Sequence, residues 1–268
     1  ALFPLPLWLP NAYTYAPSVV TVFLAATATK IAVYVMLRVL FTVFPDGFVA
    51  SSPTGDLFIL LGIVGILTAS IYAIYQSNVK RLLAYSSVAQ IGYIALGIGF
   101  ASATGLIATL VHLFNHALMK GALFMAIGAI IYRLGECRMD KLHGLGRQMP
   151  WTFGAIVVGG LSLIGVPGTA GFISKWYLVS AAIEQQAWLS VTAILVGSLL
   201  AVIYIGKIIE ALYFKPALDS NQNIKEAPLL LLLPTWVLVM ANVYFGLNTE
   251  LTVGVAEQAV KLMGVSGQ

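Results

Sequence analysis

The sequence predicts an all-α polytopic membrane protein with about seven transmembrane helices. Apolar residues make up 60% of the 268 residues and charged residues 9%, whereas a soluble domain carries about a quarter charged residues. The mean hydropathy is +0.94. Apolar runs of about twenty residues recur, while strands of a transmembrane barrel would alternate over segments of about ten. Most of the surface is therefore expected to face lipid.

The apolar runs and the turn residues between them set the expected elements. Residues 1–16 are rich in Pro and aromatic residues and too interrupted to span, so we expect a short interfacial or re-entrant piece. A polar tail with an amphipathic turn or two near 253–263 ends the chain. The spans between them are expected at about 17–44, 56–76, 80–100, 104–134, 150–183, 187–214 and 228–247.

Proline and glycine mark the ends and the one interruption of these spans. Pro17 opens the first span, where its missing N–H is tolerated, and Pro45-Asp46-Gly47 ends it. The charged loop 135–148 separates the fourth span from the fifth. The fifth span is interrupted by Gly165-Val166-Pro167-Gly168-Thr169-Ala170-Gly171, which predicts a broken helix.

Basic residues are confined to alternate loops. With seven spans these loops fall on one side, which the positive-inside bias makes cytoplasmic, so the C-terminus is expected outside. The bacterial inner membrane is the expected location, and an organelle membrane remains an alternative. The basic loop residues are Lys80, Arg81, Arg133, Arg138, Lys141, Arg147, Lys207, Lys215 and Lys225. The opposite loops hold Asp46, Asp56 and Glu184.

Several classes of protein are disfavoured by composition. The net charge of +4 is small and dispersed, so we expect no nucleic-acid partner. Cys137 is the single cysteine, which rules out a disulfide framework. No redox cofactor motif is found, and we expect no cofactor. The chain opens without an initiating Met or a basic segment, so it is no signal peptide and resembles the interior of a longer polypeptide.

Charged residues inside the spans are the candidates for function. A Lys at the bilayer centre costs about 3 kcal/mol on insertion scales and needs a partner or a water-filled cavity. Lys30 lies in the middle of the first span, too far from either end to reach the surface easily. Lys175 lies just after the interruption of the fifth span, and a buried charge beside a broken helix is typical of transporter ion sites. The alternatives are a structural lysine and a break made for packing alone.

His112, His116 and Lys120 form a polar stripe in the fourth span. Their spacing of four places them on one helical face, and imidazole takes up and releases protons near neutral pH. The stripe therefore predicts a proton relay. A role in joining helices by hydrogen bonds is one alternative. Metal binding by the two histidines is another, disfavoured because no Cys or carboxylate completes a site nearby.

Ordered blocks of residues resemble the proton-translocating antiporter-like membrane subunits. These subunits are shared by respiratory complex I, membrane-bound hydrogenases and multisubunit cation/proton antiporters of the Mrp type. The resemblance covers essentially the whole chain. Its blocks are Leu7 to Tyr13, Ala25 to Lys30, Asn78 to Tyr93, His112 to Phe124 and Gly165 to Tyr177.

The resemblance implies half of a larger fold. Family members have fourteen helices in two inverted halves, each with a broken helix. Residues 1–268 would form a single membrane domain, matching the chain from the second part of the seventh helix through the fourteenth. The seventh-helix Lys and fifth-helix Glu of the family would lie outside it. Asn11 stands where the family often has Asp, which puts a role for that position in doubt.

By position in the family, Lys30 resembles the eighth-helix proton-path lysine. His112, His116 and Lys120 resemble the eleventh-helix relay, and Lys175 the residue that ends the path in the twelfth helix. A Lys at 175 is more similar to the N-type subunits of complex I and the D-type of Mrp than to the M-type. The absence of a long lateral helix argues against the L-type.

The resemblance implies a proton-translocating half-channel in a multisubunit membrane complex, for example a translocase such as NADH:quinone oxidoreductase. Other membrane subunits are the expected partners, including a chain that supplies the missing N-terminal helices. Electron transfer would belong to other subunits. Two alternatives stay open. The chain could be an antiporter module that moves Na⁺ or K⁺ against H⁺, or a structural subunit without conduction of its own.

Overall fold

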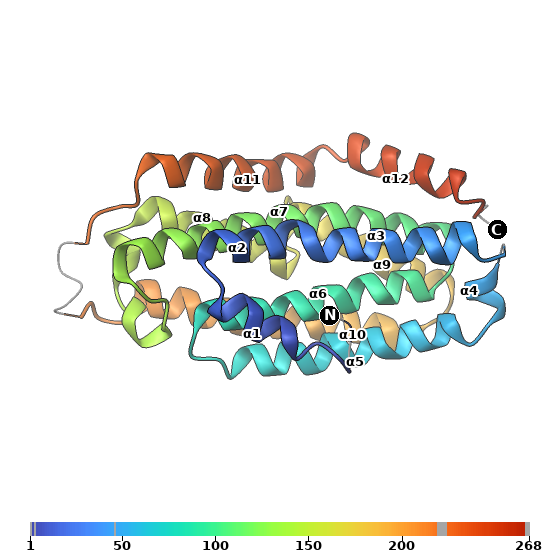
Figure 1. Ribbon diagram of the computed structural model, residues 1–268, viewed down its shortest axis with the longest axis horizontal. Coiled ribbons are helices and arrows are strands. Elements are labelled where there is room, and N and C mark those ends of the chain that lie inside the picture. The colour runs from blue at the N-terminus through green and yellow to red at the C-terminus, as the bar shows by residue number, and fades with distance from the viewer. Residues whose placement is uncertain (1, 3, 46, 219–223, 266–268) are drawn as a thin grey trace.

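Long apolar helices run side by side along the longest axis of the protein (Figure 1). The computed structural model describes residues 2, 4–45, 47–218 and 224–265. Within these residues, six helices are long and apolar enough to cross a membrane. They cover Ser18–Val43, Thr54–Ile74, Val79–Gly99, Ala103–Leu134, Trp188–Phe214 and Leu229–Leu247. The protein is therefore a multi-pass membrane protein, as predicted.

The remaining crossing is a broken helix. It consists of α8 (Pro150–Ile164) and α9 (Ala170–Glu184), and the turn between them contains Gly165 with φ of 92°. A positive φ suits glycine and ends a helix by turning the chain. The predicted interruption is confirmed at this place. Helices α8 and α9 together run from one end of the bundle to the other (Figure 1), which brings the crossings among the described residues to the predicted seven.

The unbroken spans begin and end at the residues that helix chemistry favours. Asn78 and Ser102 cap α6 (Val79–Gly99) and α7 (Ala103–Leu134) by accepting hydrogen bonds from the backbone N–H groups of Arg81 and Gly105. Gly135 ends α7 with φ of 79°. The further helices are α5 (Thr54–Ile74), α10 (Trp188–Ile209), which continues as a π-helix (Glu210–Phe214), and α11 (Leu229–Leu247).

The first crossing is assembled from four short helical pieces. These are α2 (Ser18–Phe23), a π-helix (Leu24–Ala28), α3 (Thr29–Arg38) and a second π-helix (Val39–Val43). A π segment widens a helix locally and is frequent at functional sites. The first of these π segments lies directly before Lys30.

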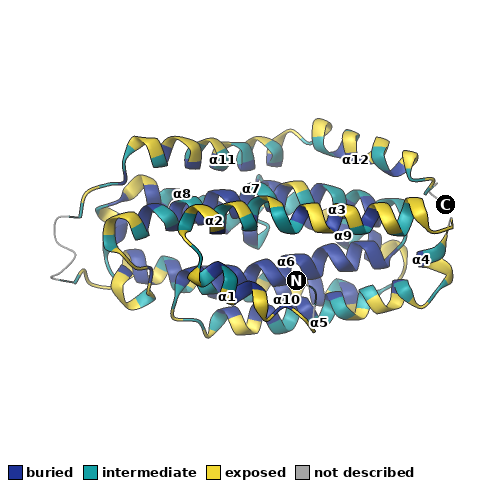
Figure 2. Cartoon of the chain, viewed as in Figure 1, coloured by how far each residue is buried: buried dark blue, intermediate teal, exposed yellow. Residues whose placement is uncertain are grey.

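Helix α6 is the centre of the bundle. Nearly all of its residues are buried, and Figure 2 shows it as an almost uniformly buried helix surrounded by partly exposed ones. Glycines bring α5 onto it: a Cβ on Gly62 would lie 2.8 Å from the carbonyl oxygen of Gly92. A Cβ on Gly99 would likewise lie 2.7 Å from the carbonyl oxygen of Gly55. Small residues allow two helix backbones to come this close. The resulting van der Waals packing holds helices together in a membrane, where the hydrophobic effect does not drive them to associate.

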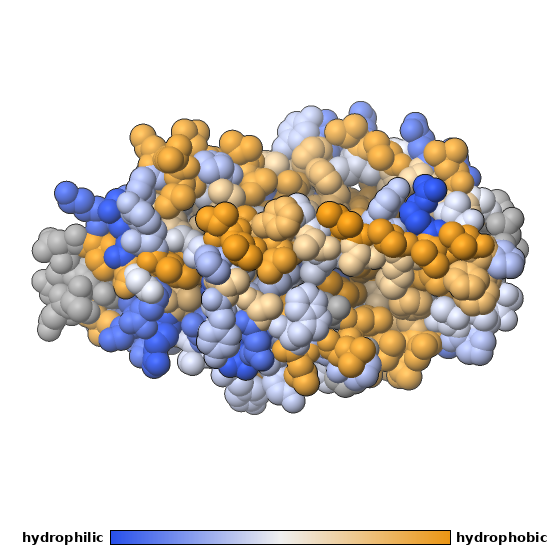
Figure 3. Space-filling view, in the orientation of Figure 1, coloured by the Kyte–Doolittle hydropathy of each residue, from blue (hydrophilic) through white to orange (hydrophobic). Residues whose placement is uncertain are grey.

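Connecting loops gather at the two ends of the bundle. The loops α5–α6, α7–α8 and α10–α11 lie at one end, and the C-terminal end of the described chain lies at the other (Figure 1). The basic loops predicted to share a side therefore do so. Short helices occupy the α7–α8 loop (Met139–Leu142 and Leu145–Arg147) and the opposite end (α4, Phe48–Ser51). Asp46 is outside the described residues. Apolar side chains dominate the face between the ends (Figure 3).

The two terminal segments are more ordered than the sequence indicates. Helix α1 (Trp8–Tyr15) packs against α6 inside the bundle, where Leu9 and Tyr13 are fully buried, so it is a re-entrant piece rather than an interfacial one. The tail forms α12 (Glu250–Leu262), a helix of 13 residues where we expected a turn or two. Its buried residues, including Val253, pack on α7, and this apolar stripe explains its length.

Candidate functional site

The predicted stripe lies on the fully buried face of α7. His112, His116 and Lys120 are each 0% exposed. The imidazole rings of the two histidines are stacked, with centroids 6.0 Å apart and planes inclined by 18°. This separation agrees with about 6 Å for a four-residue step along a helix. It is too long for a direct hydrogen bond but suits one bridging water.

Both histidines have nitrogens available for such a water. His112 Nδ1 is hydrogen-bonded to Ser174 Oγ at 2.7 Å, whereas His112 Nε2 has no partner among the described residues. The same holds for both ring nitrogens of His116. Buried polar atoms are rarely left without a partner, because the penalty is about 1–3 kcal/mol. The unpartnered nitrogens are therefore suited to hydrogen-bonding a water between the rings.

Lys120 extends the stripe toward α6. Its Nζ donates to the carbonyl oxygen of Leu83 at 2.9 Å and to Ser86 Oγ at 2.5 Å. It also lies 5.9 Å from the ring centroid of Phe124. No carboxylate lies in an ion pair with it within the described chain, so its neighbours are neutral hydrogen-bond acceptors.

Lys30 approaches the stripe from the neighbouring crossing. Its Nζ donates to the carbonyl oxygen of Ala25 in the π segment and, at 3.4 Å, to Thr29 Oγ1. In the wider turn of the π-helix, the carbonyl group of Ala25 is directed toward Lys30, five residues later. A Cβ on Gly121 would lie 3.8 Å from Ala26, so α7 meets the π segment beside Lys120. Lys30 accordingly interacts electrostatically with all three residues of the stripe.

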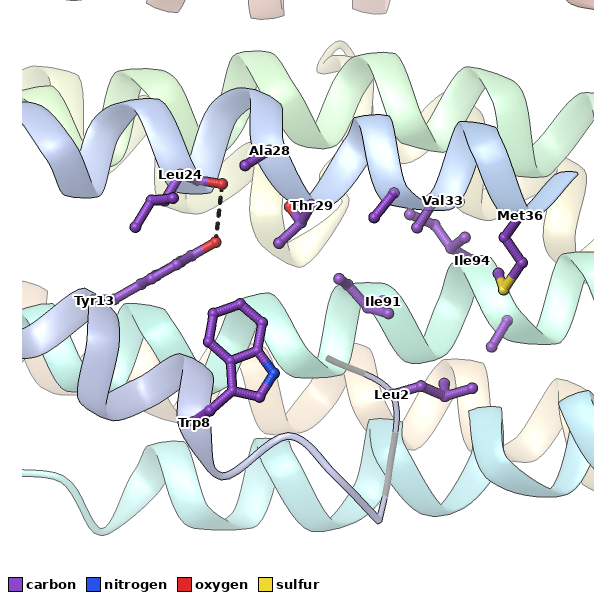
Figure 4. A pocket seen from close by; sticks show the side chains of 12 residues that line it. Leu2, Trp8, Tyr13, Leu24, Ala28, Thr29, Val33, Met36, Ile91 and Ile94 are labelled. Carbon is purple, nitrogen blue, oxygen red and sulfur yellow. Dashed lines mark hydrogen bonds between the residues drawn. The ribbon is translucent and has the colours of Figure 1, made fainter. Parts of the chain in front are cut away.

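A cavity of about 230 Å³ lies beside Lys30, between α1, α3 and α6. Tyr13 donates to the carbonyl oxygen of Leu24 at 3.1 Å across its wall (Figure 4). Thr29 faces the cavity from α3 and Trp8 from α1 (Figure 4). Its lining is mainly apolar, with the hydroxyl groups of Tyr13 and Thr29 as polar points next to Lys30.

Lys175 caps the carbonyl end of the half-helix α8. Its Nζ donates to the carbonyl oxygens of Leu163 and Ile164, at 3.0 and 2.8 Å, and to Ser198 Oγ at 3.0 Å. These carbonyls have no partner within their own helix, because the break at Gly165 ends it there. The carbonyl end of a helix carries a partial negative charge that favours a cation.

The break itself is braced from two neighbouring helices. Asn115 Nδ2 on α7 donates to the carbonyl oxygen of Ala170 at 2.6 Å. Ser162 Oγ donates to Asn242 Oδ1 on α11 at 3.1 Å and accepts from the N–H of Gly171 at 3.2 Å. These bonds fix the first turn of α9 relative to α7. Ser174, just after that turn, meets His112, so the brace holds α9 against the histidine stripe.

The five residues predicted from the sequence thus lie along one buried line. It runs from Lys30 and Lys120 through the histidines and Ser174 to Lys175. The sequence did not single out Ser174, Ser198 or Tyr93; the ring centroid of Tyr93 lies 5.8 Å from that of His112. No group of three metal-ligating side chains is found in the part of the chain that the structure describes.

Lys80, counted among the basic loop residues in the sequence, is buried in the first turn of α6. It is 5% exposed, and its Nζ donates to the carbonyl oxygen of Ala16 at 2.5 Å. Ala16 follows the last residue of α1. Lys80 therefore caps the carbonyl end of the re-entrant helix α1, as Lys175 caps that of α8.

Beyond Lys175 the bundle becomes apolar again. Leu178, Ala181 and Ala182 of α9 pack in one buried cluster with Leu96 of α6 and with Phe100, which follows α6. On its far side lies a recess of about 530 Å³, whose lining includes Ser102, Thr104, Glu184 and Gln185. The cluster separates the buried line from this recess, to which we refer as the outer recess.

Comparison with known proteins agrees with this arrangement. Residues 1–201 match the family described as NADH:quinone oxidoreductase/Mrp antiporter, TM. The chain belongs to this family. The NADH:quinone oxidoreductase/Mrp antiporter family thus accounts for the first five crossings and most of α10. The resemblance found in the sequence is confirmed.

Relatives within the family share the fold over nearly the whole chain. The chain is 40% identical over 262 residues to NADH-quinone oxidoreductase subunit N of Desulforudis audaxviator, covering 93% of the chain and 52% of the relative. It superimposes on a chain of the Mrp complex from Dietzia sp. with a TM-score of 0.89 at 26% identity, covering 98% of this chain and 56% of that one.

A third similarity is to the membrane-bound sulfane sulfur reductase, an archaeal respiratory membrane complex. One of its chains superimposes with a TM-score of 0.87 at 30% identity, over 98% of this chain and 53% of that one. The chain therefore spans about half the length of the family members that it matches. These relatives belong to a respiratory complex and an Mrp complex alike, so the fold is common to both kinds.

Proposed function

We propose that this chain is a proton-translocating half-channel subunit of a multisubunit membrane complex of the complex I, membrane hydrogenase or Mrp type. One observation carries the proposal: a buried line of titratable side chains crosses an apolar bundle. Lys30 receives protons, Lys120, His116 and His112 pass them on, and Lys175 holds them at the helix break. Residues 1–268 act in this as one membrane domain.

The chemistry of the line favours protons over other ions. Lysine and histidine take up and release protons, and waters between the stacked rings carry them across gaps of 6.0 Å. Na⁺ and K⁺ prefer oxygen ligands, and a line of cationic groups repels them. The antiporter alternative would place cation transport elsewhere in the complex. A structural subunit without conduction would not explain why both ring nitrogens of His116 are buried with no hydrogen-bond partner among the described residues.

We further propose that the end bearing the basic loops faces the cytoplasm and the C-terminus the opposite side. The basic loop residues gather at one end of the bundle, which fits the positive-inside bias. The bacterial inner membrane is the location that we propose. Reporter fusions after Gln148 and after Thr249, read as cytoplasmic or external activity, test the orientation. Activity on the reversed sides would contradict it.

The proposed complex includes other membrane subunits and the helices that complete this fold. The relatives are about twice as long, and the cavity beside Lys30 lies at the edge of the bundle. The completing helices come either from the same polypeptide or from a related second chain. Intact mass spectrometry of the purified complex distinguishes these cases. A complex that contains this half alone, with no related companion, would contradict this part of the proposal.

Replacement of Lys175 tests the function itself. We expect Lys175→Ala to lower proton transport by the assembled complex about a hundredfold, the lower end of the range for loss of a proton-transferring group. Proton uptake is measured in vesicles, and native gels verify assembly. Lys261→Ala, which removes an exposed lysine of α12, is the matched control. Wild-type uptake by fully assembled Lys175→Ala would show that the line does not conduct.

A further inference from the structure

A second set of hydroxyl groups, all but one of them buried, lies beside the histidine stripe. It consists of Ser86 and Tyr93 on α6 and Ser198 and Tyr204 on α10. Tyr93 is 1% exposed and Tyr204 0%. The proposed line of lysines and histidines uses neither tyrosine, although an apolar site tolerates a buried phenol only where its hydroxyl has a partner.

At one end this set touches Lys120. The Nζ of Lys120 donates to Ser86 Oγ at 2.5 Å. The hydroxyl of Tyr204 lies against Ser86, but it makes no complete hydrogen bond to any described residue. It therefore has both its donor and its acceptor capacity available.

At the other end the set touches Lys175. The Nζ of Lys175 donates to Ser198 Oγ at 3.0 Å and lies 4.9 Å from the ring centroid of Tyr93. The Tyr93 hydroxyl lies beside Ser198 and donates to the carbonyl oxygen of Ile194 at 3.4 Å, a long and weak bond. The hydroxyls of Tyr93 and Tyr204 also interact electrostatically with each other.

Helix α10 leaves room for the Tyr93 hydroxyl at one position. A Cβ on Gly197 would lie 2.5 Å from Tyr93 Oη and 2.4 Å from Ile66 Cγ2. Any larger residue would displace the hydroxyl from α10. A Cβ on Gly206, further along the same helix, would have nothing within 4 Å. The close packing of α10 against its neighbours is therefore specific to the surroundings of Gly197.

From this geometry we propose that Ser86, Tyr204, Tyr93 and Ser198 form a second branch of the proton path. The branch joins Lys120 to Lys175 without passing through His112 or His116. It rests on the proposed function, since it assumes that protons travel between these two lysines. The branch would make the two crossings α6 and α10 part of the conducting structure, together with α7.

Proton transfer along the branch needs no charged tyrosine. The ammonium of Lys120 gives a proton to Ser86 Oγ, and each hydroxyl accepts one proton while releasing its own to the next oxygen. A water between the two phenols completes the chain. The last hydroxyl, that of Ser198, releases its proton to Lys175 in its neutral amine form. One proton has then moved, and all four hydroxyls remain neutral.

Phenylalanine substitutions test the branch, because Phe keeps the ring and removes the oxygen. Tyr204→Phe and Tyr93→Phe are made in the wild-type complex and in a His116→Gln background. Proton transport is measured in vesicles at equal assembly. With two parallel branches, we expect each Phe to slow transport about twofold alone but about tenfold or more when His116 is also replaced.

Two matched pairs separate this effect from loss of packing. Gly197→Ala should slow transport as Tyr93→Phe does, whereas Gly206→Ala on the same helix should not. Tyr85→Phe removes a hydroxyl from a tyrosine that stacks on Tyr72 outside the branch, and it should transport at the wild-type rate. If Tyr204→Phe does not assemble, Ser86→Ala breaks the same link.

The outcomes distinguish the branch from the function on which it rests. The branch is overturned if both Phe variants transport at the background rate with and without His116, while Lys175→Ala still fails to transport. The proposed function fails if Lys175→Ala itself transports normally. A loss that is equally large in the wild-type and His116→Gln backgrounds shows a single series path rather than two branches, and this too overturns the inference.

Discussion

Glu226 and Lys175 lie at opposite ends of the same half-helix, α8. One carboxylate oxygen of Glu226 accepts from the backbone N–H of Trp151 at 2.8 Å, and the other accepts from the Thr152 hydroxyl at 2.6 Å. Lys175 donates to the last carbonyls of the helix. An anion at the amino end and a cation at the carbonyl end both match the helix dipole. The half-helix is therefore stabilised by charge at both ends.

Removing the charge of Glu226 should destabilise α8 without touching the proposed path. We expect Glu226→Gln to lower the free energy of unfolding by about 1 kcal/mol, the usual value of a helix cap. Thermal unfolding in detergent measures this change. Glu257→Gln, on the exposed face of α12, is the control. Equal unfolding temperatures for the Glu226 variant and wild type would show that the cap contributes nothing.

Replacing His116 by glutamine separates a relay from hydrogen-bonded packing. The amide keeps a donor and an acceptor but cannot take up and release a proton near neutral pH. We expect slower proton transport at unchanged assembly, measured in vesicles and on native gels. If the stripe only joins helices, His116→Gln will transport as fast as wild type.

Gly171 is the tightest point of the helix break. A Cβ there would lie 1.8 Å from the carbonyl oxygen of Ser162, so Gly171→Ala must push α8 and α9 apart. We expect a loss of stability of about 3 kcal/mol, the upper range for overpacking, visible as reduced assembly. A Cβ on Gly254 would have nothing within 4 Å, so Gly254→Ala is the control. Normal assembly and melting of the Gly171 variant would contradict the geometry.

Cys137 should react slowly with thiol reagents in the folded protein. Its thiol is buried in the α7–α8 loop, and burial raises its pKa. A raised pKa leaves less of the reactive thiolate at neutral pH. We expect labelling by N-ethylmaleimide, followed by mass spectrometry, to be slower than in protein unfolded with detergent and to accelerate as the pH rises. Equal rates for folded and unfolded protein would contradict this.

Local sequence patterns predicted the spans and the central line because both follow from spacing along one helix. The four-residue step of His112 and His116 determined their common face, and the cluster of Gly and Pro after Ile164 determined the break. Ser174, Ser198 and Tyr204 were missed because their meaning depends on the rotation of α9 and α10 against other helices. That rotation is decided by packing, for example by the room that Gly197 leaves.

The same limit explains the differences at Lys80 and in the tail. Lys80 begins a span, so its sequence position is typical of an anchor at the membrane surface. Its contact with Ala16 arises only because α1 enters the bundle, which no local pattern reveals. Helix α12 owes its length to its apolar contact with α7, where Val253 packs, and such a contact between distant segments is equally hidden.

The apolar cluster between Lys175 and the outer recess has an electrical consequence. Glu184 follows Lys175 by nine positions on α9, so the cluster is about 14 Å thick at a rise of roughly 1.5 Å per residue. A membrane potential of 100 mV does about 2.3 kcal/mol of work on one charge that crosses the whole bilayer. In this conformation the apolar side chains keep a charge on Lys175 from moving through that potential toward the outer recess. Passage of a charge from Lys175 to the outer recess would therefore require α6 and α9 to part.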